Sequence, residues 1–287
     1  MKRTATKDLK AWMDSPSRQP LVLRGARQVG KTWLVRELAQ ASGKDLIEIN
    51  FERDPSFADC FVENDPQQII GRIGLRLRRK IDPATTILFL DEIQAYGEGL
   101  AKLRWFYEEL PELPIIAAGS LLELTLQDHR FSMPVGRIAF YNLYPVGFSE
   151  YLEACERQDL AGFLRSWSPE HGPLDGIVHE EAAKEFERFS MTGAMPGIVQ
   201  RALDGASSED IRDAQRQLCA TYRADFPKYS GRMQADILDK VLISVVRQIG
   251  QKFVMSHVGE GVKNQQAKDA LELLCKLRGR NALVVLF

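Results

Sequence analysis

The sequence has 287 residues and a formal net charge of −1, and 45% of its residues are hydrophobic. This length suits two domains, and the composition is that of an ordinary globular protein. The near-zero charge excludes a polyanion-binding surface spread over the whole molecule, so a nucleic-acid site would have to be a local patch. No apolar run approaches the roughly 20 residues of a membrane span. We therefore expect no membrane partner. The four cysteines are far apart and include no CxxC pair, which argues against a disulfide framework and favours a reducing cytoplasm.

Strand-like and helix-like segments alternate over the first 150 residues. Strands are predicted at 21–23, 46–49, 87–90, 115–118 and 138–144, and helices at 7–13, 31–41, 66–80 and 100–110. The strands are short and apolar, as expected of parallel strands that are buried on both faces. The alternation therefore predicts a three-layer α/β fold with a parallel sheet.

The pattern changes after Pro145, where only helical segments follow. They are predicted at 150–156, 179–189, 208–226 and 236–249. Ser149 is the expected N-cap of the helix at 150–156. Ser207 is the expected N-cap of the helix at 208–226, and the acids Glu209 and Asp210 follow in its first turn. The sequence thus predicts two domains, an α/β domain over 1–150 and a mostly helical domain over 151–287.

A glycine-rich loop follows the first strand. Residues 25–32 match the pattern G-x-x-x-x-G-K-[ST], which wraps backbone N–H groups around phosphates at a helix N-terminus. Lys31 is expected to bridge the β- and γ-phosphates, and Thr32 to ligate Mg²⁺. The predicted nucleotide contacts are Gly25, Ala26, Arg27, Gln28, Val29, Gly30, Lys31, Thr32 and Trp33.

Two acidic residues end the strand at 87–90. Since the carboxyl ends of parallel strands share one edge of the sheet, Asp91 is expected beside the loop, holding Mg²⁺ with Thr32. Glu92 is the candidate general base that polarises an attacking water. Ser120 follows the next strand and is either a hydrogen-bond donor to the γ-phosphate or the water, or a serine in an ordinary turn.

Other nucleotide chemistries fit less well. The sequence has no Asn-Lys-x-Asp segment of the kind that reads guanine. The basic run Arg76, Arg78, Arg79 and Lys80 is better interpreted as a solvated helix face than as the lid of a metabolite kinase. The Asp91-Glu92 pair favours water as the acceptor, and hence hydrolysis.

Three strings together resemble one protein family: RGARQVGKT (24–32), LDEIQ (90–94) and Gly119-Ser120. They are similar to the archaeal-ATPase-like branch of the AAA+ P-loop ATPases, and more narrowly to prokaryotic ATPases with a C-terminal domain of unknown function. The string GAMPG (193–197) is a further family mark.

This resemblance implies an ATPase with one extra strand between the two strands that carry the nucleotide motifs. It also implies that Ser120 is a sensor. Arg137 would act at the γ-phosphate, within the chain or across the subunit boundary of a homo-oligomer. An arginine buried in a structural ion pair is the equal alternative for Arg137.

Family members continue into a winged-helix-like segment and then an endonuclease-like domain. Here 254–276 is expected to supply a partial winged helix, with Lys263, Lys268 and Lys276 as candidate phosphate contacts or simply a solvated basic face. The segment 277–287 departs from the family pattern, so we expect a truncated member.

These features predict a Mg²⁺-dependent ATPase that hydrolyses ATP to ADP and phosphate in order to switch or remodel a protein or DNA partner. Two alternatives stay open. One is a nucleotide-binding scaffold with little turnover, and the other is a DNA-binding module that uses the winged-helix segment.

Overall fold

The computed structural model describes residues 1–119, 134, 136–229 and 235–277. The chain divides into two compact units. The first comprises 3–26 and 30–143 and is called the α/β unit, and the second comprises 1–2, 27–29 and 144–287 and is called the helical unit.

The α/β unit is built on a sheet of five parallel strands in the order β2-β3-β4-β1-β5. Their bounds are Leu21–Arg24 for β1, Asp45–Asn50 for β2, Thr86–Asp91 for β3, Ile115–Ala118 for β4 and Ala139–Asn142 for β5. All six residues of β3 are buried, as expected of a central parallel strand. β4 lies between β1 and β3, which is the extra strand that the family resemblance implies.

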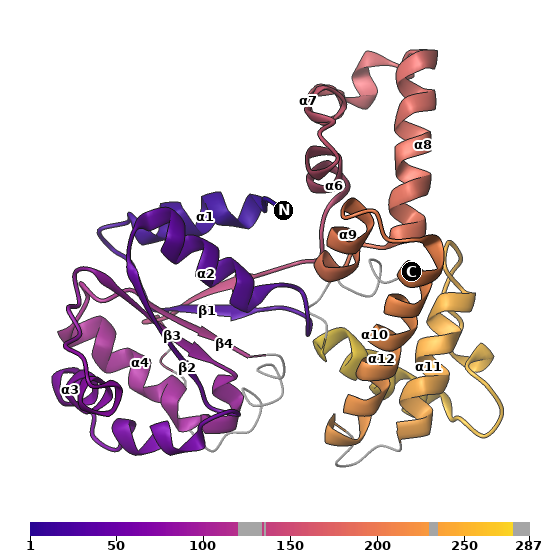
Figure 1. Ribbon diagram of the computed structural model, residues 1–287. Helices are drawn as coiled ribbons and strands as arrows, with labels where there is room; N and C mark the ends of the chain where they lie inside the picture. The colour runs from indigo at the N-terminus through magenta and orange to yellow at the C-terminus, as the bar shows by residue number, and fades with distance from the viewer. Residues whose placement is uncertain (120–133, 135, 230–234, 278–287) are drawn as a thin grey trace. The chain divides into compact units, whose positions relative to one another are not determined.

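Helices cover both faces of this sheet (Figure 1). On one face lie α1 (Thr4–Met13) and α2 (Lys31–Ser42), and on the other lie α3 (Pro66–Leu77) and α4 (Glu98–Glu109). Two 3-10 turns, η1 (Pro55–Phe61) and η2 (Ile93–Tyr96), pack beside α3 and α4. The predicted three-layer α/β class is therefore confirmed.

Local sequence explains where α3 begins and ends. The Asp65 carboxylate accepts hydrogen bonds from the backbone N–H groups of Gln67 and Gln68, and Pro66 occupies the first helical turn. The helix ends at Leu77, because Arg78 adopts a left-handed conformation (φ 53°) that stops it. The predicted helix ran on to Lys80 because nothing in the basic run marks this stop.

The helical unit contains the remaining helices of the described chain. They are α6 (Phe148–Ala154), α7 (Gln158–Ser166), α8 (Gly176–Thr192), α9 (Pro196–Leu203), α10 (Ser208–Tyr229), α11 (Ala235–Arg247) and α12 (Asn264–Leu277), with 3-10 turns at Pro169–His171 (η3) and Met255–His257 (η4). This confirms a mostly helical C-terminal part, although the sequence did not predict α7 and α9.

Two predicted helix caps can be compared with the structure. Ser207 caps α10 as predicted, since its hydroxyl accepts from the Asp210 N–H at 3.2 Å and the Asp210 carboxylate accepts from the Ser207 N–H at 3.1 Å. The prediction for α6 was wrong. Gly147, not Ser149, is the N-cap residue, and its N–H donates to the Glu150 carboxylate at 3.0 Å.

The predicted winged-helix segment packs as helices. α11, η4 and α12 share a core that includes Leu238, Val258 and Ala270. No strand occurs among the described residues from 254 to 277, so this part supplies helices without a wing. The expected departure from the family after residue 277 lies outside the described residues.

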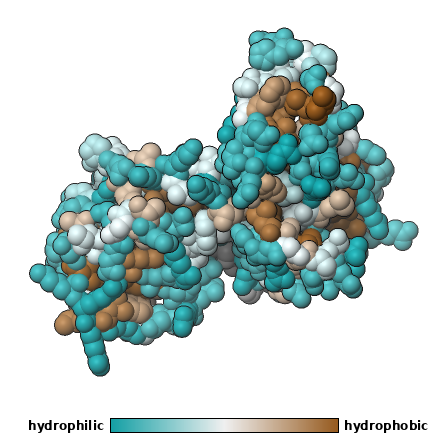
Figure 2. Space-filling model, turned by 45° about the horizontal axis from the view of Figure 1, so that its top comes forward, coloured by the Kyte–Doolittle hydropathy of each residue, from teal (hydrophilic) through white to brown (hydrophobic). Residues whose placement is uncertain are grey.

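The surface of the helical unit also carries apolar side chains (Figure 2). The exposed apolar residues of this unit include Phe163 on α7 and Ile177 on α8, and the Ile177 residue is 76% exposed. None of the described helices is both long and apolar enough to cross a bilayer.

Candidate functional site

The glycine-rich loop joins the carboxyl end of β1 to the start of α2. Gly25 has φ 145°, and Gly30 has φ 96° at the N-cap of α2. These are backbone conformations that a side chain disfavours, so the two glycines allow the turn. The first N–H groups of α2 follow at once, and a helix N-terminus of this kind attracts anions.

The Lys31 ammonium is held inside the loop. Its Nζ donates to the carbonyl oxygens of Gly25 at 2.9 Å and Ala26 at 3.0 Å, and the residue is only 8% exposed. A buried ammonium needs such partners, because removing it from water is costly. The lysine is thus positioned over the loop before any phosphate arrives.

Asp91 lies beside Thr32 at the same edge of the sheet. The Thr32 hydroxyl donates to Asp91 Oδ2 at 3.0 Å, and the Glu92 N–H donates to Oδ1 at 3.1 Å. Burial raises the pKa of Asp91, the Thr32 hydrogen bond opposes this, and the neighbouring Glu92 charge raises it further. Burial and the Glu92 charge thus disfavour the ionised form of this carboxylate, and its two hydrogen-bond donors are neutral groups.

The Thr32 hydroxyl and the Asp91 carboxylate are ligands of the type that Mg²⁺ prefers. Mg²⁺ takes oxygen ligands and is held in nucleotide enzymes by one or two protein groups together with phosphate oxygens. In the described residues no group of three or more His, Cys, Asp or Glu side chains could form a complete protein cage. The hydroxyl and the carboxylate are thus a partial ligand set that a nucleotide's phosphates would complete.

Glu92 follows Asp91 at the carboxyl end of β3. Its backbone is left-handed (φ 48°), which is uncommon for a residue with a side chain. Its Oε2 accepts a hydrogen bond from Gln94 Nε2 at 2.6 Å. The candidate base is therefore held both by its backbone and by a neighbouring amide.

Sequence analysis assigned no role to Gln94 or to Gly119, although both lie in the strings that resemble the family. Gly119 follows β4, and a Cβ atom placed on it would lie 2.1 Å from Gln94 Oε1. Gln94 and Gly119 are 25 residues apart in the sequence, so spacing gives no sign that they meet. The one signal was that both residues belong to strings that resemble the family.

The remaining predicted nucleotide contacts are placed differently. Arg27, Gln28 and Val29 group with the helical unit, in which Arg27 Nη1 donates to Asp225 Oδ2 at 2.7 Å. Trp33 is 42% exposed on α2. Ser120 lies outside the described residues.

Arg137 lies near the amino ends of the parallel strands, whereas the glycine-rich loop lies at their carboxyl ends. It precedes β5, whose first residue Ala139 pairs with Leu21 at the start of β1, whereas the loop follows the end of β1. Its guanidinium donates to Glu108 on α4, and this bond holds the pKa of Glu108 below its usual value. Within the chain Arg137 thus lies away from the loop, in an ion pair whose arginine side chain is 40% exposed rather than buried.

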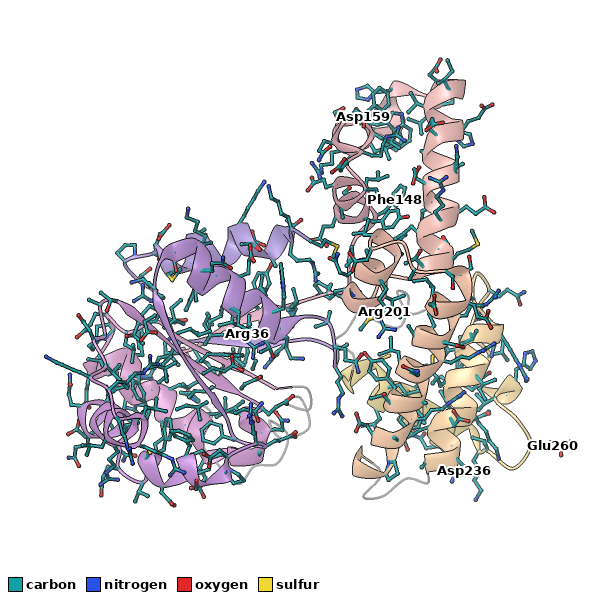
Figure 3. All side chains as sticks on the ribbon, in the orientation of Figure 1. Arg36, Phe148, Asp159, Arg201, Asp236 and Glu260 are labelled. Atoms are coloured by element: carbon teal, nitrogen blue, oxygen red, sulfur yellow. The ribbon has the colours of Figure 1, made fainter. Side chains whose placement is uncertain are left out.

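Arg36 on α2 is an exposed arginine that pairs with an acid of the neighbouring strand (Figure 3). It forms two hydrogen bonds of 2.8 Å to the Glu48 carboxylate on β2, and this pairing raises the pKa of Arg36. One acidic side chain near Asp91 is thereby neutralised.

Comparison with known proteins identifies the α/β part of the chain. Residues 17–152 match the family model described as an AAA domain. The chain carries an AAA domain. All five strands, the glycine-rich loop, Asp91 and Glu92 lie within the matched range, and the resemblance to AAA+ ATPases is confirmed. Residues 183–279 match a second model, described only as a domain of unknown function.

Three solved structures are similar to this chain, and the one with a TM-score above 0.5 supports its fold. A Walker-type ATPase of Pyrococcus abyssi superposes with a TM-score of 0.58 at 16% identity, covering 96% of this chain and 89% of that one. The ORC2 protein of Aeropyrum pernix matches with a TM-score of 0.46 at 14% identity, covering 96% and 85% of the two chains. Cdc6p of Pyrobaculum aerophilum gives a TM-score of 0.34 at 15% identity, covering 95% and 78%. No curated protein matches the sequence.

Proposed function

We propose that the AAA domain binds ATP together with Mg²⁺ and hydrolyses it to ADP and phosphate. One observation carries the proposal. Lys31 donates to the loop carbonyls of Gly25 and Ala26 at 2.9 and 3.0 Å, Thr32 donates to Asp91 at 3.0 Å at the carboxyl edge of the sheet, and Glu92 is the next residue. A cation, a hydroxyl paired with a carboxylate and a second acid are groups that serve phosphoryl transfer to water.

Each residue has a separate task. The N–H groups of the loop and of the first turn of α2 bind phosphate oxygens, and Lys31 leaves its carbonyl partners to bridge the β- and γ-phosphates. Thr32 and Asp91 would hold Mg²⁺, which would supply positive charge to the phosphates when bound. Glu92 accepts a proton from the attacking water as the water oxygen bonds to the γ-phosphorus, and the bond from that phosphorus to the β–γ bridging oxygen breaks, so that ADP leaves.

The proposal extends to the use of the energy. The nucleotide state would switch the helical unit or a protein or DNA partner, and 254–276 is the proposed contact for DNA. The principal alternative is a scaffold that binds nucleotide without turning it over. An AAA fold alone does not choose between these uses, because related folds serve many tasks.

Two substitutions test the chemistry. Lys31→Ala should abolish ATP binding measured by isothermal titration, while the exposed Lys80→Ala should bind as the wild type does. Glu92→Gln should keep ATP affinity and lose roughly 10²- to 10⁴-fold in kcat, which is the usual contribution of a general base. Glu109→Gln, an exposed glutamate of the same unit, is its matched control.

The outcomes separate the alternatives. Full hydrolysis by Glu92→Gln would remove that residue as the base. A wild type that binds ATP but shows no turnover, with or without DNA, would support the scaffold. Stimulation of turnover by DNA that falls with rising salt would support a DNA partner.

A further inference from the structure

The Gln94 side chain lies between two carboxylates at the edge of the sheet. Its Nε2 donates to Glu92 Oε2 at 2.6 Å and approaches Glu52 Oε1 at 3.4 Å. An amide nitrogen has two hydrogens, so it can serve both acids at once. The bond to Glu92 is the shorter of the two.

The other end of the amide is enclosed by Gly119. Gln94 Oε1 is buried and has no hydrogen-bond partner in the described part of the chain. A Cβ atom at residue 119 would lie 2.1 Å from this oxygen and 3.2 Å from the amide carbon. The Gln94 amide therefore occupies the space that a side chain at residue 119 would need.

The two carboxylates decide which way the amide faces. Turning the amide over would place its carbonyl oxygen against the Glu92 carboxylate, where two acceptors would meet. The orientation seen instead turns the amide N–H groups toward Glu92 and Glu52. Glu92 itself has a left-handed backbone (φ 48°), and the Gln94 contact holds one oxygen of its carboxylate.

We propose that Gln94, packed against Gly119, is a positioning residue that aims the Glu92 carboxylate at the attacking water. The inference rests on the proposed ATPase function, in which Glu92 is the base. The Gln94 contact fixes one oxygen of the Glu92 carboxylate, which leaves the other oxygen for the water. A displacement of about 1 Å at a catalytic group is enough to cost up to roughly 10²-fold in rate.

The experiment is a double-mutant cycle read as ATP affinity and kcat. Gln94→Ala should lower kcat by about 10-fold or more at unchanged ATP affinity, because it frees the base without touching the phosphate loop. Gly119→Ala should do the same, because its methyl group displaces the amide, and its backbone conformation accepts alanine. The double variant should be no slower than Gln94→Ala alone, since the clash then has no target.

Two further variants separate positioning from packing. Gln94→Glu keeps the size of the side chain but loses the donor, so it should also lose kcat. Gln68→Ala is the matched control, because the Gln68 amide binds the Asp65 carboxylate at 3.1 Å on α3, away from the site. It should leave kcat unchanged. Thermal unfolding of every variant shows whether the fold is retained.

The results separate this role from the proposed function. A wild type that hydrolyses ATP at a rate unaffected by Gln94→Ala overturns the positioning role alone. Additive losses in the Gln94–Gly119 cycle, or full activity of Gln94→Glu, overturn it as well. A wild type without turnover refutes the ATPase function and, with it, this role.

Discussion

The Thr32 hydroxyl donates a 3.0 Å hydrogen bond to Asp91, although 59 residues separate the two in the sequence. The bond joins the first turn of α2 to the end of β3 across one edge of the sheet. The hydrogen-bond donors to this buried carboxylate are neutral, and an adjacent acid makes its charge less favourable still. A divalent cation would relieve both effects.

Asp91→Asn should therefore stabilise the nucleotide-free protein at neutral pH. Burial raises the pKa of Asp91 above its ordinary value of 3.8. The stability linked to this group is thus complete below 3.8 and is lost as the pH rises through the folded-state pKa. Unfolding by denaturant should show a gain for Asp91→Asn at neutral pH that shrinks as the pH approaches 3.8.

The same variant should lose the stabilisation that Mg²⁺ adds to bound ATP, because asparagine keeps the acceptor for Thr32 but not the charge. Thermal shifts with ATP, measured with and without Mg²⁺, report this directly. A variant that is less stable than the wild type at neutral pH would contradict the assigned cost of burying Asp91.

Two leucines of the α/β unit differ in burial and can be compared as a matched pair. Leu88 on β3 is fully buried, whereas Leu75 on α3 is 81% exposed. Leu88→Ala should lower the free energy of unfolding by about 2–5 kcal/mol, through lost burial and the cavity that it leaves. Leu75→Ala should change it by less than about 0.5 kcal/mol. Urea unfolding of both variants checks this, and equal losses would refute the packing described for β3.

The sheet and the loop were predictable because local sequence carries their physics. Residues 87–90 form an apolar run because β3 is buried on both faces, and the loop pattern needs glycine where φ is positive. Parallel strands then bring Asp91 to the loop without further information. α7 and α9 were missed because each is short, and Pro196 at the start of α9 suggests a turn.

The placement of Arg137 and Gln94 was not predictable in this way. Arg137 precedes β5, which runs parallel to β1 with Ala139 beside Leu21, so it lies at the amino ends of the strands. The expectation that it acts at the γ-phosphate came from the family resemblance and did not follow from the predicted sheet. The Gln94–Gly119 contact depends on the positions of two strand ends.

Arg137→Ala should leave ATP affinity and kcat of the single chain unchanged. The side chain pairs with Glu108 at the edge of the sheet away from the loop, and exposed ion pairs contribute little to stability. ATP turnover measured over a range of protein concentrations checks this. A loss of kcat that appears only at high concentration would instead indicate that Arg137 acts in a neighbouring subunit.

Two glycines test whether backbone conformation at the loop sustains function. Gly30 has φ 96° at the start of α2, so Gly30→Ala forces a strained backbone, should cost about 1–2 kcal/mol of stability and should displace Lys31. ATP binding should fall below detection by isothermal titration. Gly71 lies inside α3, where an added Cβ would meet nothing within 4 Å, so Gly71→Ala should stabilise the helix by about 0.5–1 kcal/mol and leave ATP binding intact. Normal ATP affinity in Gly30→Ala would show that the phosphate site does not depend on this turn.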